Sequence, residues 1–243
     1  MNHSIVDQKH WDKRYEEQIL DIVNINNPIR QLIIKYIPPG NGKCFEIGAY
    51  PCRYLSIFGT LGYELNGIDT THKIESSELK TWMENNNWKI GFLEKINFID
   101  FNTEKKFDIV CSFGFIEHFK NWKEIILKHT EILKKDGYII IETPNFAGIF
   151  QRVFHILVDY DNYKRHIIKS MNPKKWADLL GNNYEIIFEG YVGKASFWHE
   201  NQKINIFQRI VIKCFSIICR IVKKFSYSRL YSPYCCLIAK KTA

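Results

Sequence analysis

The segment 43–55 constrains the fold most, because it predicts a short buried strand, a tight turn and the start of a helix in direct succession. Glu46 closes the apolar run and Gly48 opens the turn, where glycine lets the backbone approach a ligand closely. In open α/β sheets, ligands bind at the carboxyl ends of the strands, beside turns of this kind. A second apolar run ends at Asp69, about twenty residues on, where an acid suits a ribose hydroxyl pair. These residues predict an α/β sheet with a ligand site at its carboxyl edge.

The rest of the chain continues the alternation of strands and helices. Apolar runs predict further strands at 97–101, 107–113, 138–143, 184–191 and 234–239. Helical spacing predicts helices at 4–20, 29–36, 53–61, 75–86 and 122–135, the last of them ended by Gly137. The run 138–143 is apolar over its first four residues, as is typical of a strand that is buried on both faces.

Composition places the chain among globular proteins of reducing compartments. Its 243 residues suffice for one large domain or two small ones. The seven cysteines, odd in number and without a C-x-x-C pair, predict buried reduced thiols rather than a disulfide framework. The polar stretch 1–14 lacks the apolar core of a signal peptide, so we expect a cytoplasmic protein.

The positive charge is confined to the end of the chain. The formal net charge is +8, yet no acid follows Glu200. The basic residues beyond that point are Lys203, Arg209, Lys213, Arg220, Lys223, Lys224, Arg229, Lys240 and Lys241. Because the body of the chain is close to neutral, the sequence does not predict a nucleic-acid surface.

Further motifs follow the first turn in a recognisable order. The run 107–119 contains F-D-I-V-C-S and then E-H, the run 138–145 ends in T-P-N, and 11–15 reads W-D-K-R-Y. In this order, these segments resemble the class I S-adenosylmethionine-dependent methyltransferases of small molecules. The resemblance implies a Rossmann-like, doubly wound, mostly parallel seven-stranded sheet whose last strand is antiparallel.

The resemblance also implies a single domain over 1–243. A helical cap at 1–37 would precede a cofactor-binding core at 38–145. An acceptor-side half at 146–243 would follow, with a helical insertion at 193–232. Within that half, the aromatic-rich stretch 146–163 is expected to form a helical lid or a wall of the acceptor site.

The resemblance implies a binding site for S-adenosyl-L-methionine. The residues that match the family's cofactor contacts are Tyr15, Glu46, Gly48, Ala49, Asp69, Asp100, Phe101, Ser112, Phe113 and Glu117. Among them, Asp69 matches the ribose acid, and Asp100 with Phe101 the adenine site. The alternative for both aspartates is a turn or N-cap role, which suits that residue type. For Tyr15, the alternative is a helix that only packs on the sheet.

Tyr50 and Cys52 depart from the family pattern, because they stand where its glycines usually stand. Their side chains must point away from the cofactor, or the loop must run wider, since only glycine leaves the backbone unconstrained. We interpret the loop as a weakened pattern that still binds the cofactor. The alternative is a relic of the fold that has lost the cofactor.

His118 and His166 are the candidate catalytic bases, because a base is needed when the acceptor is a protonated hydroxyl or amine. Each has a plainer alternative, an orienting or capping role for His118 and an ordinary surface position for His166. No cluster of His, Cys and acids has metal-ligand spacing, so the sequence predicts no metal. The prediction is a methyltransferase for a small-molecule or lipid-linked acceptor, acting by direct displacement at an acceptor oxygen.

Two other classes compete with this prediction. One is a non-catalytic binding or scaffold protein with the same fold, tethered by its basic helix. The other is a nicotinamide-dependent oxidoreductase, which is disfavoured because an intact G-x-G-x-x-G is missing while Ser112 and the 117–118 pair are present.

The segment 204–225 predicts an amphipathic helix. Its polar residues recur at intervals of three and four and leave a wide apolar face opposite. The stripe is too basic for a transmembrane span but suits an interfacial helix on anionic lipid. The alternatives are packing on its own domain or on a second subunit. We therefore expect peripheral contact with the inner membrane surface or a homodimer as possible roles.

Overall fold

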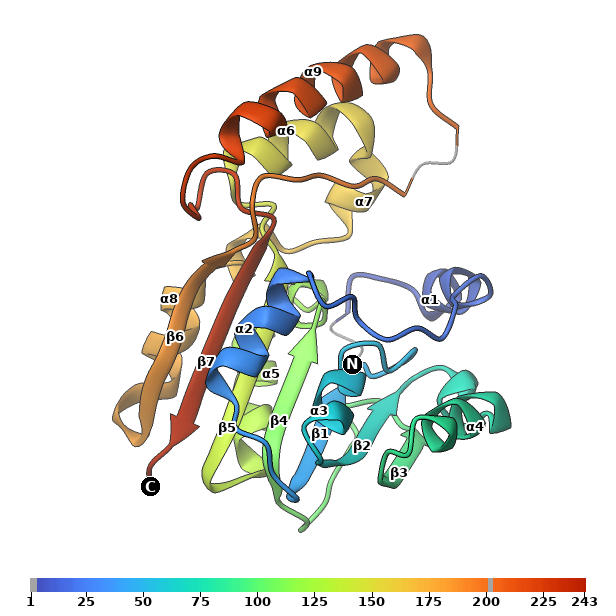
Figure 1. Ribbon diagram of the computed structural model, residues 1–243, viewed down its shortest axis with the longest axis vertical. Helices are drawn as coiled ribbons and strands as arrows, with labels where there is room; N and C mark the ends of the chain where they lie inside the picture. Colours follow the sequence, from blue (N-terminus) through green and yellow to red (C-terminus); the bar gives the residue numbers. More distant parts are fainter. Residues whose placement is uncertain (1–3, 201–202) are drawn as a thin grey trace.

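A seven-stranded sheet forms the centre of the computed structural model, which describes residues 4–200 and 203–243 (Figure 1). The strands are β1 (Lys43–Ile47), β2 (Glu64–Asp69), β3 (Ile90–Lys95), β4 (Phe107–Phe113), β5 (Leu133–Pro144), β6 (Tyr184–Val192) and β7 (Tyr234–Lys241). Their spatial order is β3-β2-β1-β4-β5-β7-β6. Only β7 runs antiparallel to its neighbours β5 and β6. The predicted doubly wound sheet with an antiparallel last strand is confirmed.

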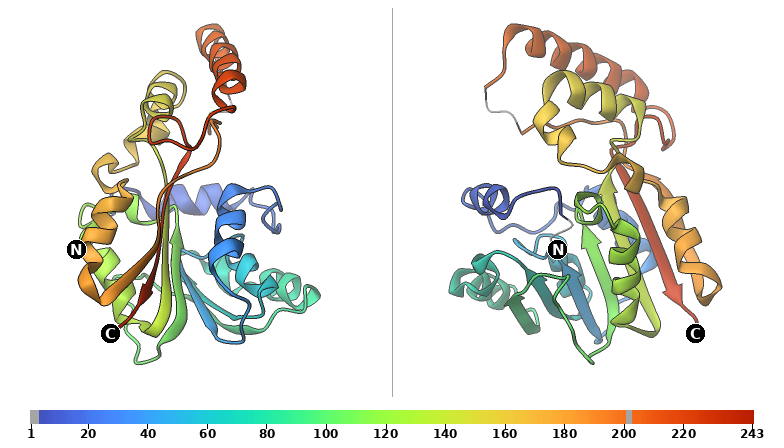
Figure 2. Two further views of the ribbon diagram at one scale, coloured as in Figure 1. Left: turned by 60° about the vertical axis from the view of Figure 1, so that its left-hand side comes forward. Right: turned by 180° about the vertical axis from the view of Figure 1, so that it is seen from behind.

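Helices cover both faces of the sheet (Figures 1 and 2). One face packs on α2 (Pro28–Tyr36), α3 (Leu55–Thr60) and α4 (Ser77–Asn85), and the other on α5 (Trp122–Glu131) and α8 (Pro173–Leu180). Short 3-10 helices lie at η1 (His72–Glu75), η2 (Ile116–His118), η3 (Ile168–Ser170) and η4 (Gly181–Asn183). Because side chains alternate along a strand, β4 contributes Cys111 to the first core and Val110 to the second.

An upper lobe stands above the carboxyl ends of the strands (Figures 1 and 2). It consists of α6 (Ile149–Val158), α7 (Tyr160–Lys164) and α9 (Ile206–Val222). Phe215 of α9 packs on Phe150 and Phe154 of α6, with ring centroids 4.8 and 5.2 Å apart. Beside this lobe, α1 (Gln8–Tyr15) lies over the end of the sheet near β1 and β2 (Figure 1). The carboxyl edge is therefore covered from two sides.

Three predicted elements differ from the structure, and the first is the helix predicted at 4–20, which spans only Gln8–Tyr15. Residues 98–100 form a turn, and the strand predicted at 97–101 is wrong because β3, the edge strand, spans Ile90–Lys95. The predicted helix 122–135 ends at Glu131, so Gly137 lies inside β5 rather than after a helix. A Cβ at Gly137 would lie 2.9 Å from the Asp108 carbonyl, where the β4–β5 register shifts. Glycine permits this close approach at a bulge.

Candidate active site

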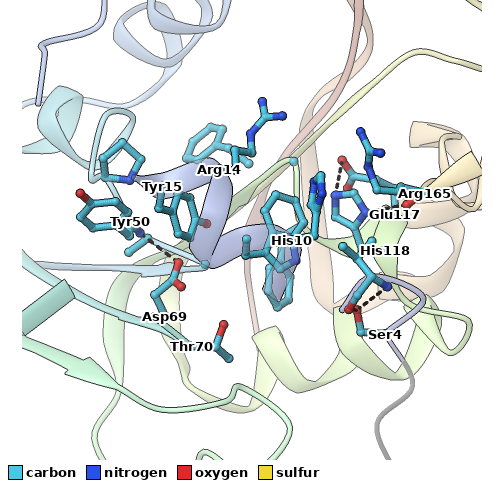
Figure 3. Close-up of a pocket in the computed structure, with 18 of the residues that line it drawn as sticks. Ser4, His10, Arg14, Tyr15, Tyr50, Asp69, Thr70, Glu117, His118 and Arg165 are labelled. Atoms are coloured by element: carbon cyan, nitrogen blue, oxygen red, sulfur yellow. Dashed lines mark hydrogen bonds and ion pairs between the residues drawn. The ribbon is translucent and has the colours of Figure 1, made fainter. Parts of the chain in front are cut away.

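A cavity of about 500 Å³ lies at the carboxyl ends of β1, β2, β4 and β5, beneath α1 and the upper lobe (Figure 3). It is the position that the sheet topology predicts for a ligand. Nine of the predicted site residues line it, namely Tyr15, Glu46, Gly48, Ala49, Asp69, Phe113, Glu117, His118 and His166. The cavity thus joins the residues expected at the cofactor with those expected at the acceptor.

The loop after β1 has positive φ angles at Gly48 and at Cys52, although only the first of these is a glycine. Gly48 has φ +71°, and the N–H groups of Gly48 and Ala49 both donate to the Ile68 carbonyl at 3.0 Å. Cys52 also has a positive φ of 65°, while its side chain is fully buried in the core behind the loop. Tyr50 lines the cavity, and its ring meets that of Tyr15 edge-on at 4.9 Å. Of the two departures, only Tyr50 reaches the ligand side.

Asp69 is buried at the end of β2 and already holds four donors. Its Oδ2 accepts from the Tyr50 N–H at 3.1 Å, and its Oδ1 accepts from the Thr71 N–H at 3.0 Å. The Thr70 N–H and the Tyr15 hydroxyl are the other two donors. Burial raises the pKa of Asp69 to about 6, and these hydrogen bonds oppose the shift. The carboxylate is therefore oriented by the first loop and by α1 together.

Glu46 has one oxygen without a partner. The Leu55 N–H donates to this carboxyl, but its Oε2 has no hydrogen bond from the described residues. The side chain is 3% exposed, and burial raises its pKa well above the ordinary value. A buried carboxylate oxygen without a donor is costly, so a cationic or N–H ligand group in the cavity would fit it.

Three predicted residues lie away from the cavity lining. Asp100 is exposed in the turn after β3, and Phe101 stacks on Phe45 in the core with ring centroids 5.2 Å apart. Both were expected at the end of a strand that the structure does not contain. Ser112 faces α5, where its hydroxyl bonds His129 Nε2 at 3.0 Å, because it alternates with the cavity-lining Phe113.

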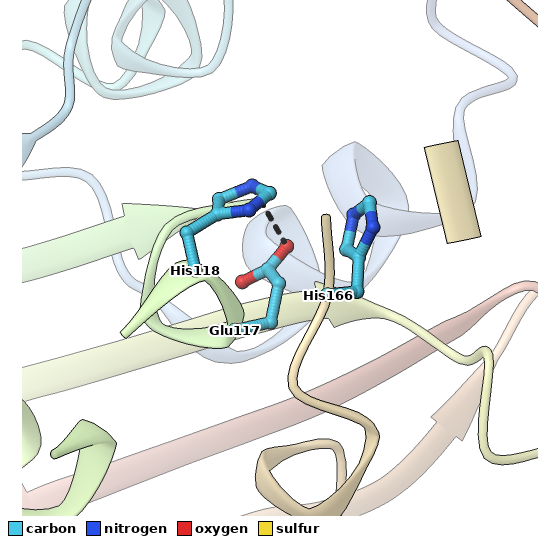
Figure 4. A group of neighbouring side chains, drawn as sticks. All are labelled: Glu117, His118 and His166. Atoms are coloured by element: carbon cyan, nitrogen blue, oxygen red, sulfur yellow. Dashed lines mark ion pairs between the residues drawn. The ribbon is translucent and has the colours of Figure 1, made fainter. Parts of the chain in front are cut away.

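A second polar group gathers at the other end of the cavity (Figure 4). Glu117 and His118 lie in η2 after β4, and His166 follows α7, with the two imidazole centroids 4.8 Å apart. His118 Nδ1 bonds the Arg165 carbonyl at 2.7 Å, and His166 Nδ1 bonds the Asn162 carbonyl at 2.7 Å. Burial lowers the pKa of each histidine to about 3, so both imidazoles are neutral at physiological pH.

Several residues that line the cavity were not predicted from the sequence as site residues. They are Trp11, Arg14, Asn97, Phe98, Glu142, Arg165, Trp198 and Glu200. Arg14 and Arg165 both pair with Glu200, which links α1 to the upper lobe across the cavity. If the end of β3 had been predicted correctly at Lys95, Asn97 and Phe98 would have been expected just after a strand end, where ligands bind. The ion pairs join segments that are distant in sequence, so no local sequence pattern predicts them.

Comparison with known proteins identifies the family. A family model described as a methyltransferase domain matches residues 23–208, which is more than half of the chain. The chain therefore belongs to the methyltransferase family, and the expectation of a class I S-adenosylmethionine-dependent methyltransferase is confirmed. A search of curated proteins finds no match.

Solved structures share the fold at low sequence identity. A methyltransferase from Archaeoglobus fulgidus is 20% identical, with a TM-score of 0.51 over 88% of this chain and 93% of that one. The N-methyltransferase NodS from Bradyrhizobium japonicum WM9, in complex with S-adenosyl-l-homocysteine, is 10% identical, with a TM-score of 0.54 over 95% and 98%. Coclaurine N-methyltransferase, bound to N-methylheliamine and SAH, is 10% identical, with a TM-score of 0.57 over 88% and 72%.

Proposed function

We propose that this enzyme transfers the methyl group of S-adenosylmethionine to an oxygen of a small-molecule or lipid-linked acceptor. The observation that carries the proposal is the single cavity that joins Glu46 and Asp69 to the His118–His166 pair. A direct displacement needs the nucleophile held about 3 Å from the methyl carbon in a dry site. One continuous cavity with different chemistry at its two ends can hold both reactants side by side.

The cofactor end is proposed around the loop after β1. The unpartnered Glu46 Oε2 would accept a hydrogen bond from the amino group of the cofactor, and Gly48 would allow the close backbone approach. Asp69 would hold the ribose hydroxyls, which would take the place of the Tyr15 hydroxyl. Asn97 and Phe98 would border the adenine. When bound, S-adenosylmethionine supplies an electrophilic methyl group on a sulfonium.

The acceptor end is proposed around the two histidines. Both imidazoles are neutral, which is the form in which a general base takes a proton from a hydroxyl acceptor, but a pKa of about 3 makes each a weak base in the ligand-free protein. Trp11 packs its ring edge-on to His118 with centroids 5.0 Å apart, and Phe146 lies 4.6 Å from His166. These rings exclude water from the proton transfer and offer apolar contact to the acceptor.

Calorimetric titration of the purified protein with S-adenosylmethionine and with NAD tests the proposal. We expect binding of the first and none of the second. Binding of NAD alone would refute the proposed function. Binding of S-adenosylmethionine without methyl transfer to a panel of hydroxyl and amine acceptors would instead favour the scaffold alternative.

Asp69→Ala is expected to weaken S-adenosylmethionine binding by about 1–3 kcal/mol, because a hydrogen-bonded pair of ribose hydroxyls loses its acceptor. This corresponds to a rise in Kd of about 5- to 150-fold. Asp100→Ala is the matched control, since its exposed carboxylate lies outside the cavity lining. Equal loss in the two variants would contradict the assignment of the ribose contact to Asp69.

We further propose that α9 brings the enzyme to anionic membranes. Exposed apolar residues lie along one side of the helix and just beyond its end, namely Ile206, Phe207, Ile210, Ile217, Ile218, Ile221 and Phe225. Arg209, Lys213 and Arg220 form the adjoining face, while Phe215 and its neighbours pack on α6. An apolar stripe bordered by cations and free of acids suits the boundary between headgroups and acyl chains.

The groove between α6 and α9 supports contact with lipid. Its volume is about 280 Å³, and its lining consists of Ile149, Phe150, Val153, Phe215, Ile218, Val222, Leu230 and Tyr231. Across residues 4–200 and 203–243, no helix is long and apolar enough to cross a bilayer. The proposed contact is therefore peripheral, and a lipid-linked acceptor would reach the enzyme from the same surface.

Co-sedimentation with vesicles tests this contact. We expect binding to vesicles with phosphatidylserine, little binding to pure phosphatidylcholine, and loss of binding at high salt. Ile210→Ser and Ile217→Ser are expected to weaken it, because these side chains are 56% and 58% exposed. Ile19→Ser, at a 78% exposed position outside the lobe, is the control. If analytical ultracentrifugation shows a dimer, and if the α9 variants dissociate it, the exposed face of α9 is a subunit interface instead.

A further inference from the structure

The three polar side chains at the acceptor end form a compact group with metal-ligand chemistry. Within the described residues, one ligand atom each of Glu117, His118 and His166 lies within 4.8 Å of the other two (Figure 4). The closest recorded pair is His118 Nε2 and Glu117 Oε1, at 4.0 Å. His166 is distant in sequence from the other two, which is why no ligand spacing appears along the chain.

Both imidazoles are oriented as metal-ligating histidines usually are. Each Nδ1 is engaged by a backbone carbonyl, that of Arg165 for His118 and that of Asn162 for His166. A second-sphere hydrogen bond of this kind fixes the tautomer and leaves Nε2 as the free lone pair. These carbonyls thus aim two nitrogen donors at one region of the cavity wall.

Glu117 lacks the partner that a buried carboxyl group requires. It is fully buried, and neither carboxylate oxygen has a hydrogen bond within the part of the chain that the structure describes. An ionised carboxylate in that setting is costly unless a cation compensates it. A metal ion bound beside the two imidazole Nε2 atoms would supply the partner that Glu117 lacks.

We propose that Glu117, His118 and His166 bind one divalent first-row transition-metal ion, with open coordination positions that face the cavity. Two imidazole nitrogens and one carboxylate are a donor set that Zn²⁺, Co²⁺ and Fe²⁺ accept. Bonds of about 2.0–2.2 Å require the three side chains to approach one another slightly. The Glu117 carboxylate is free to make that movement, because it has no hydrogen bond to lose.

The open positions give the ion a place in the proposed reaction. An acceptor hydroxyl bound there would be oriented toward the cofactor end and would become more acidic, as oxygen ligands of such ions do. This role rests on the proposed methyl transfer to oxygen, whereas the binding of the ion does not. In the metal-free protein, the same Nε2 atoms would act directly as the proton acceptors.

Titration of the chelator-treated, full-length protein with Co²⁺ tests the site, because the visible absorption of Co²⁺ reports coordination number and ligand type. We expect one equivalent with a spectrum of low coordination number, nitrogen and oxygen ligation, and displacement by Zn²⁺. Glu117→Gln and His166→Asn should each raise the Kd at least about tenfold. His10→Asn, which alters a histidine that lines the same cavity, should not change it.

Further readouts keep the outcomes separate. Thermal melting of each variant shows whether it is folded, and S-adenosylmethionine binding should persist in the His166→Asn variant because His166 lies at the acceptor end. Absence of a saturable Co²⁺ site, unchanged affinity in both folded variants, or a spectrum with thiolate ligation would overturn the inference. Methyl transfer by the metal-free protein at the same rate as by the metal-bound protein would refute the role of the ion in the reaction. Failure to bind S-adenosylmethionine would refute the proposed function while leaving the metal site standing.

Discussion

Gly48→Ala is expected to lower the free energy of unfolding by about 2–4 kcal/mol and to abolish measurable cofactor binding. Gly48 has φ +71°, a conformation that costs an alanine roughly 1–2 kcal/mol. A Cβ there would lie 2.7 Å from Cδ2 of Phe115, whose ring lines the cavity and packs on Phe98 and Phe119. Relief of that clash moves the ring or the loop, and both border the proposed cofactor site.

Gly181→Ala separates the two contributions to that loss. Gly181 also has a positive φ, +68° with ψ −162°, but a Cβ there has no described atom within 4 Å. We expect this control to cost about 1–2 kcal/mol and to leave cofactor binding intact. Urea unfolding and calorimetry measure both effects. Equal losses of stability in the two variants would mean that the contact with Phe115 is accommodated without cost.

Glu142→Gln is expected to make the ligand-free protein more stable than the wild type at pH 8.5, with little difference below pH 4.5. Glu142 lies on β5 in the cavity wall and is 3% exposed, and burial raises its pKa from 4.5 to about 8. Between these values, the folded protein retains a proton that the unfolded chain releases. The wild type therefore loses stability as the pH rises through this window, whereas glutamine cannot ionise.

The size of the effect follows from the same interval. A carboxyl whose pKa moves from 4.5 to about 8 costs up to about 5 kcal/mol once it is ionised in the folded state. Urea unfolding of both proteins at pH 4.5 and pH 8.5 measures it. Glu185→Gln is the control, because this carboxylate on β6 is exposed. A Glu142→Gln advantage that is independent of pH would rule out ionisation of Glu142 as its cause.

Local patterns were sufficient for most of the framework. The runs at 107–113 and 138–143 form buried strands because continuous apolar residues satisfy a sheet covered on both faces. The helix predicted at 29–36 is α2, which begins at Pro28 and is capped by the Asn27 side chain. The rule that strand ends meet at one edge then brought Glu46 and Asp69 to one cavity.

Edge elements and element ends were less predictable. The strand β3 has only Leu93 buried, so its pattern is weak, and the prediction fell on 97–101 instead. The helical periodicity of 122–135 extends past residue 132, but from Leu133 on the chain belongs to β5, where Leu133 pairs with Phe107. Tertiary pairing overrode a local preference in that case, as often happens at the ends of elements.

The sequence by itself determined the sheet, its family and the residues at the strand ends, because each depends on periodicity and on short motifs. Only the tertiary structure decided that His166 meets Glu117 and His118, and that Glu200 bridges Arg14 to Arg165. It also divided the apolar side of α9 into a packed face and an exposed one. These features depend on which distant segments pack against one another. The burial and the ion pairs that determine their chemistry therefore exist only in the folded protein.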